Sequence, residues 1–93
     1  MDAKAITDLV EDYWRGAIPV MQHSGPTAFK AMGARFEERI QQIAALMPSY
    51  EAAVFKLAVD AERERLMAEY TENPAGLKRR LGIALGVDDY RKR

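Results

Sequence analysis

The side chains best suited to chemistry in this sequence are its single histidine, His23, and the neighbouring hydroxyl of Ser24. A histidine beside a hydroxyl can act as the base that activates a nucleophile. Such a pair also needs a third group that orients the base, and neighbouring side chains on a turn diverge. No third group is recognisable here, and Gly25 and Pro26 place the pair in a turn. We therefore predict no catalytic residue and a protein that is not an enzyme.

Four carboxylates, Glu37, Glu38, Asp60 and Glu64, lie on two expected helices that can pack together. Di-metal helical bundles gather ligands in this way, but they also need Glu-x-x-His motifs that point inward. The sequence has no such motif, no cysteine to hold zinc, and no glycine pattern of a P-loop or a dinucleotide site. The carboxylates are therefore expected on a solvated surface, with no metal site and no cofactor.

Basic side chains gather toward the C-terminal end, although the whole chain has a formal net charge of zero. Residues 73–93 carry six basic and two acidic side chains, whereas residues 1–72 carry eight basic and twelve acidic ones. The candidate contacts with nucleic-acid phosphates are Lys78, Arg79, Arg80, Arg91, Lys92 and Arg93. Because consecutive helical residues point about 100° apart, residues 78–80 cannot form one basic stripe. A nucleic-acid-associated regulator is therefore the alternative function.

The segment Ala84-Leu85-Gly86-Val87-Asp88 resembles the turn of helix-turn-helix DNA-binding proteins. In those proteins a recognition helix follows the turn and lies in the major groove. Only the short stretch 88–93 follows Val87 in this sequence. The resemblance therefore assigns the chain to no family.

Apolar residues at three- and four-residue intervals predict two helices in the first half of the chain. The first helix begins at Asp2 as its cap, and its apolar residues are Ile6, Leu9, Val10, Tyr13, Trp14, Ala17 and Met21. Gly16 and Pro19 predict a kink or a break near residues 16–20. A second helix starts at the turn of residues 22–26, and its apolar stripe is Phe29, Met32, Phe36, Ile40, Ile43 and Met47.

A third helix is predicted from Ser49, as its cap, to Glu72, and the short link at Pro48 predicts a long hairpin with the second helix. This helix is apolar on two sides. One face carries Tyr50, Val54, Leu57 and Ala61, and the other, about 160° away, carries Phe55, Val59, Leu66 and Tyr70. One hairpin mate covers only one face, so the other must be covered by the first helix, the fourth helix or a second copy of the chain, and the sequence does not choose among them. We expect a protein partner or a second copy of the chain to contact Phe55, Val59, Leu66, Tyr70 and Met67.

A short fourth helix is predicted after Asn73 and Pro74, with Gly86 as its left-handed end. Its apolar face consists of Leu77, Leu81, Ala84 and Leu85. No alternating pattern typical of strands occurs. The expected architecture is therefore all-α: one domain over residues 1–87, a small antiparallel three- or four-helix bundle built on the long hairpin, and a basic tail at 88–93.

Composition bears on the function that this bundle can have. Many of the apolar residues are alanines, which bury little area, so the core is modest and self-association would help it. No apolar run approaches the ~18–20 residues that span a bilayer, and the first residues are acidic where a signal peptide is basic. We expect a cytoplasmic, non-enzymatic interaction module: a small adaptor, regulator or inhibitor that acts by surface docking, as a homodimer.

Overall fold

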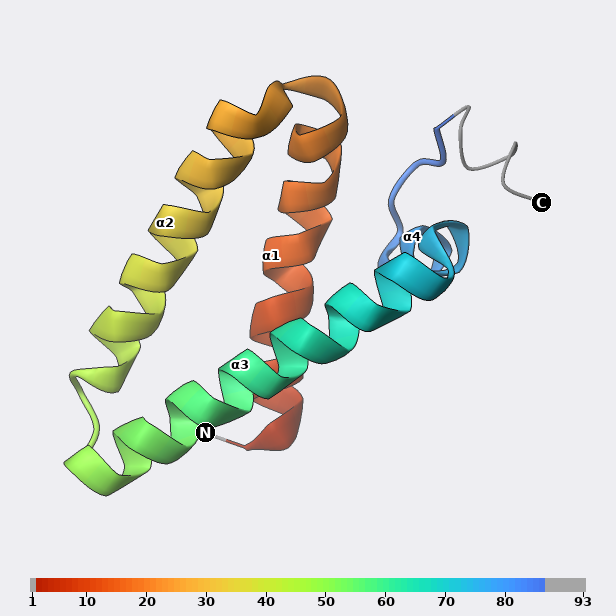
Figure 1. Ribbon diagram of the computed structural model, residues 1–93. Coiled ribbons are helices and arrows are strands. Elements are labelled where there is room, and N and C mark those ends of the chain that lie inside the picture. The colour runs from red at the N-terminus through yellow and green to blue at the C-terminus, as the bar shows by residue number, and fades with distance from the viewer. Residues whose placement is uncertain (1, 87–93) are drawn as a thin grey trace.

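The computed structural model describes residues 2–86, and this part of the chain folds into four α-helices without a strand. The helices are α1 (Ala3–His23), α2 (Gly25–Ala44), α3 (Ser49–Glu72) and α4 (Pro74–Leu81). The predicted all-α bundle is confirmed. Figure 1 shows α1 and α2 as neighbours joined by a tight turn, with α3 crossing α1. The predicted basic tail at 88–93 lies outside the described residues.

Helix α1 begins at the predicted cap but does not end where expected. The Asp2 carboxylate accepts a hydrogen bond from the backbone N–H of Ala5 at 2.8 Å. The predicted break near residues 16–20 is absent, because the helix continues through Pro19 to His23. Ala17 and Ile18 beside the proline are fully buried. Their burial offsets the backbone hydrogen bond that a proline cannot donate.

Helix α2 packs closely on α1 because two glycines leave room between the helices. A Cβ on Gly16 of α1 would lie 3.1 Å from Cε of Met32, and a Cβ on Gly33 of α2 would lie 3.5 Å from the hydroxyl of Tyr13. The predicted apolar stripe of α2 faces inward, and Phe36 is among its buried members. The Tyr13 and Phe36 rings lie 4.5 Å apart between centroids. Small residues at the contact therefore bring the aromatic rings into the core.

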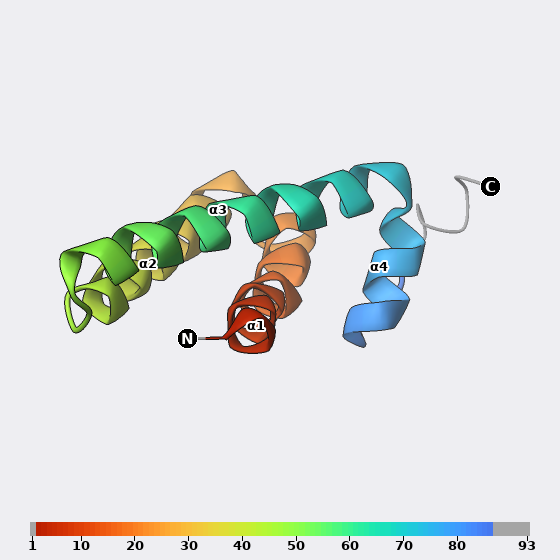
Figure 2. The same cartoon turned by 90° about the horizontal axis from the view of Figure 1, so that it is seen from below.

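Helix α3 begins and ends at the predicted residues, except that Pro48 occupies the cap position and Ser49 is the first helical residue. The hairpin of α2 and α3 is present, but its two arms diverge from the link at residues 45–48 (Figure 1). Helix α1 packs against both arms. Figure 2 shows α1 and α4 on the same side of α3, which leaves the opposite side of this helix uncovered.

Helix α4 begins at the predicted Asn73 cap, whose side-chain oxygen accepts a hydrogen bond from the N–H of Gly76 at 3.0 Å. The predicted end at Gly86 is wrong, because the helix ends at Leu81 and Gly82 adopts the left-handed conformation, with φ of 77°. Glycine is the residue that reaches this conformation at least cost, and Gly82 is the first one available after the buried Leu81. Helix α4 is therefore one turn shorter than expected.

Candidate functional site

The side of α3 that the sequence assigned to a partner faces the core of the same chain. Phe55, Val59 and Leu66 are buried, and Leu66 is fully so. Tyr70 is half-buried, and its ring stacks on that of Trp14 with 6.4 Å between centroids. Because α1 and α4 pack on this side, these side chains find their cover within one chain, which corrects the expectation that they need a partner. We call this side the inner face.

The opposite side of α3 is the exposed one. Tyr50 is 80% exposed, Leu57 is 71% exposed and Val54 is 50% exposed. Their spacing of four and three residues, continued by the exposed Ala61, places all four on one line along the helix. We call these four residues the outer stripe. Single exposed apolar side chains are ordinary, but three large ones on one line form a patch of the kind that marks an interaction site.

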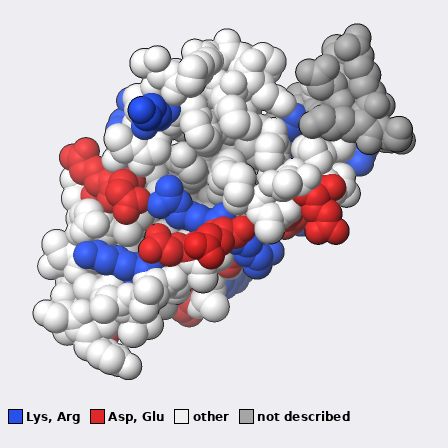
Figure 3. Space-filling view, viewed as in Figure 1, with Lys and Arg blue, Asp and Glu red and all other residues white. Residues whose placement is uncertain are grey.

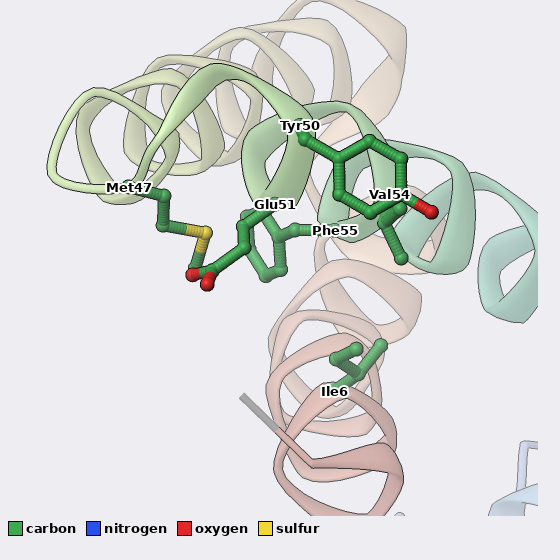
Figure 4. Close-up of a pocket in the computed structure, with 6 residues that line it drawn as sticks. All are labelled: Ile6, Met47, Tyr50, Glu51, Val54 and Phe55. Atoms are coloured by element: carbon green, nitrogen blue, oxygen red, sulfur yellow. The ribbon is translucent and has the colours of Figure 1, made fainter.

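A hollow of about 300 Å³ adjoins the beginning of the outer stripe. Figure 4 shows Tyr50 and Val54 along one edge, Met47 and Glu51 along the other, and Ile6 of α1 below. The buried Phe55 also lines it. Leu46, which precedes Met47 in the loop before α3, is 89% exposed. The apolar surface therefore extends from the helix into a recess that can receive a side chain.

Charged side chains border the outer stripe farther along α3. Figure 3 shows an uncharged surface over the start of α3 and the preceding loop, and a band of acidic and basic side chains over the rest of the helix. Asp60 and Glu64 are exposed there. Arg65 contacts Glu62 and lies 3.6 Å from Glu69, yet its side chain remains 53% exposed. An apolar patch with a charged border is the common layout of a protein-binding surface.

A second hollow, of about 450 Å³, opens between α1, α2 and α3. Its lining consists of Tyr13, Trp14, Phe29, Lys30, Gly33, Arg63, Glu64 and Met67. Of the residues predicted to meet a partner, only Met67, which is 48% exposed, lies here. Arg63 at the rim is held 2.8 Å from a carboxylate oxygen of Glu37 and lies over the Phe36 ring. The hollow joins residues remote in sequence, so periodicity could not reveal it.

The predicted basic contacts are largely taken up by the fold in the described part of the chain. The Arg80 guanidinium donates to both carboxylate oxygens of Glu69, at 3.0 and 2.9 Å, and to Glu11. These hydrogen bonds, with Glu69 first, raise the pKa of Arg80. Lys78 is fully buried and Arg79 is exposed. The other three candidates, Arg91, Lys92 and Arg93, lie outside the described residues.

A polar contact that the sequence did not indicate joins α1 to α3. The Thr7 hydroxyl donates to a carboxylate oxygen of Glu62 at 2.8 Å. Burial of this carboxyl would raise its pKa, but the hydrogen bonds from Thr7 and Arg65 outweigh that effect and lower the pKa of Glu62. The contact fixes α1 on the inner side of α3, so it helps to leave the outer stripe exposed.

The remaining candidate groups do not converge. His23 and Ser24 are exposed at the turn between α1 and α2, and Glu37 is engaged with Arg63. Within residues 2–86, no cluster of three or more histidine or acidic side chains has the arrangement of a metal site. None of the helices described here has the length and apolar character needed to cross a membrane. No protein-family model, curated protein or solved structure matches this chain.

Proposed function

We propose that this protein is a non-enzymatic interaction module that docks through the outer stripe of α3 on a protein partner, which is another protein or a second copy of this chain. The observation that carries the proposal is the contrast across this one helix, where Leu66 on the inner face is fully buried and Leu57 on the outer stripe is 71% exposed. A helix that is apolar on two sides is normally flanked on two sides. Within residues 2–86, the chain supplies neighbours for only one of them.

The spacing of the outer stripe favours a helical partner. Tyr50, Val54 and Leu57 stand at positions i, i+4 and i+7, the set of anchors that one helix offers to another. Full burial of an aliphatic side chain contributes about 1.5–3 kcal/mol before the costs of association are subtracted. Tyr50, Val54 and Leu57 beside a hollow are therefore the candidate anchors for a docked helix. We place this adaptor or regulator in the cytoplasm, since its sequence lacks the cysteines of disulfide-stabilised secreted domains.

The alternative function, nucleic-acid binding, has weaker support from the described residues. Arg80 is committed to Glu11 and Glu69, and Lys78 is buried, so two of the three basic side chains on α4 are not offered to phosphates. Docking through α3 is therefore the function that we put forward.

The test replaces one anchor by a charge. Leu57→Asp leaves the core intact because Leu57 is exposed. The variant should no longer capture any protein that the wild type binds, including a second copy of the chain, because docking would bury the new charge. Ala31→Asp is the matched control, because Ala31 is an exposed residue of α2 away from the stripe. Helix content by circular dichroism should be the same for all three proteins.

Two opposite results can be told apart. If α3 is the docking surface, the wild type and Ala31→Asp hold the same bound proteins and Leu57→Asp holds none of them. If Leu57→Asp retains what the wild type binds, α3 is not the docking surface.

A further inference from the structure

We infer that the occupant of the outer stripe is a second copy of this chain, with the two α3 helices packed antiparallel about a two-fold axis between Leu57 and Ala61. This inference rests on the proposed function and names the partner of its docking surface. Figure 2 shows that the side of α3 away from α1 and α4 is uncovered along its length. A second α3 can therefore lie along it, in an interface where each copy uses the same surface.

The outer side of α3 has the repeat of a two-helix seam. Its line of exposed residues continues beyond the outer stripe as Tyr50, Val54, Leu57, Ala61, Glu64 and Ala68. Its intervals alternate between four and three residues, the spacing of the residues that face a partner helix in a two-helix seam. We call these six residues the seam. The inner face is used by the core of the same chain, so the seam is a separate contact surface.

Side-chain size along the seam fits an antiparallel pair. The bulky Tyr50 and Leu57 lie in its first half, and the small Ala61 and Ala68 lie in its second half. In an antiparallel pair centred between Leu57 and Ala61, Tyr50 lies opposite Ala68 of the second copy and Leu57 lies opposite its Ala61. Large side chains then fill the space that small ones leave, at a constant distance between the helices. A parallel pair would set Tyr50 against Tyr50 and alanine against alanine, with crowding at one end and gaps at the other.

One pair of opposite charges that borders the seam also fits this register. Glu51 of one chain comes beside Arg65 of the other, and the two-fold axis makes this pair twice. Glu51 is exposed, and Arg65, which contacts Glu62 within its own chain, keeps 53% of its side chain exposed. On the other border, Ala53 comes beside Met67 of the second copy, which is 48% exposed in one chain. On this border Asp60, which is exposed, also comes beside Asp60 of the second copy, and these like charges oppose the pairing. Side-chain size and the Glu51–Arg65 pairs thus favour this alignment, and the Asp60 pair weakens it.

One seam residue also opposes the pairing, which is therefore a weak one. Glu64 lies opposite Val54 of the second copy, and a charged residue in a seam lowers stability while it helps to select one alignment. The pair should therefore form in a concentration-dependent manner. Glu64→Leu removes the charge and should tighten the dimer by about tenfold or more, the change that 1.4 kcal/mol produces.

The alignment can be tested by cross-linking, because the natural chain contains no cysteine. In the proposed dimer, Val54 of one copy faces Glu64 of the other. Val54 lies about 15 Å along the helix axis from Val54 of the second copy, and Glu64 lies equally far from the second Glu64, at 1.5 Å per residue. A disulfide requires Cα atoms within about 7 Å. Val54→Cys and Glu64→Cys should therefore form no disulfide dimer separately and should form one when the two variants are mixed. Disulfide dimers in the separate variants, with none between the two different chains, would overturn the antiparallel alignment.

Mass by light scattering over a concentration series tests the pairing itself. The wild type and Ala31→Asp should pass from monomer to dimer, Leu57→Asp should stay a monomer, and Glu64→Leu should dimerise at lower concentration. A wild type that stays monomeric throughout, while Leu57→Asp abolishes binding to a different protein, overturns self-pairing and leaves the proposed function standing. An equal dimer affinity for Leu57→Asp and the wild type overturns the seam. If Leu57→Asp does not fold, Glu64→Leu provides the test instead, because a dimer affinity equal to that of the wild type would also overturn the seam.

Discussion

The basic side chains of α4 differ sharply in what each one contacts. Arg80 lies between Glu11 of α1 and Glu69 of α3 and donates hydrogen bonds to both. Glu11 is itself 9% exposed, so its carboxylate depends on protein partners more than on water. Arg79, the next residue back, is exposed to solvent. Neighbouring residues of one apparent cluster thus have different roles, because a helix points them in different directions.

We predict that Arg80→Ala lowers the free energy of unfolding by about 1–2 kcal/mol, because it leaves the nearly buried Glu11 without its main partner. Arg79→Ala should change it by less than about 0.5 kcal/mol, as is usual for an exposed side chain. Urea denaturation followed by circular dichroism measures both values. Equal losses in the two variants would show that the contact of Arg80 with Glu11 and Glu69 does not stabilise the fold.

At the scale of elements, the helix ends are set by local chemistry. Asp2 and Asn73 accept hydrogen bonds from backbone N–H groups three residues ahead, and Pro74 occupies the first turn of α4. These features need only neighbouring residues, so the sequence was enough to predict them. The end of α4 was misplaced because two glycines, Gly82 and Gly86, could each serve as its cap.

The choice between these two glycines can be tested. Gly82 has a φ of 77°, whereas no positive φ occurs at Gly86. Gly82→Ala should therefore lower the free energy of unfolding by about 1–2 kcal/mol, the cost of a left-handed conformation for a residue with a Cβ. Gly86→Ala should cost less. Thermal unfolding of the two variants gives the comparison, and a larger loss for Gly86→Ala would place the end of the helix at the predicted position instead.

Helix α1 shows the opposite case, in which packing prevails over local preference. Gly16 and Pro19 both disfavour a helix interior, yet α1 runs through them. Gly16 lies where α2 approaches, and the buried Ala17 and Ile18 face the core. Contacts with another helix thus stabilise a segment that the local sequence would end.

At the scale of the whole molecule, the two sides of α3 have different roles. The inner face joins α1, α2 and α4 in one core, to which Phe55, Val59 and Leu66 contribute. The outer stripe contributes nothing to that core. Folding and docking therefore draw on different residues of the same helix, and substitutions can separate them.

We predict that Leu66→Ala lowers the free energy of unfolding by about 2–5 kcal/mol, the usual cost of truncating a buried leucine. Leu57→Ala should change it by less than about 0.5 kcal/mol when measured at a concentration that keeps the protein monomeric. Urea denaturation of both variants provides the test. Similar losses at the two positions would mean that Leu57 is buried within a single chain.

The sequence by itself determined the all-α class, the start of α2, the extent of α3, the caps at Asp2 and Asn73 and the existence of two apolar faces on α3; α2 ends at Ala44, before the predicted Met47. All of these follow from residue spacing and from interactions between near neighbours along the chain. Only the tertiary structure decided which face of α3 the chain covers. That choice depends on contacts between remote residues, such as Thr7 with Glu62 and Trp14 with Tyr70. Periodicity shows that a face is apolar, but burial is a property of whatever packs against it.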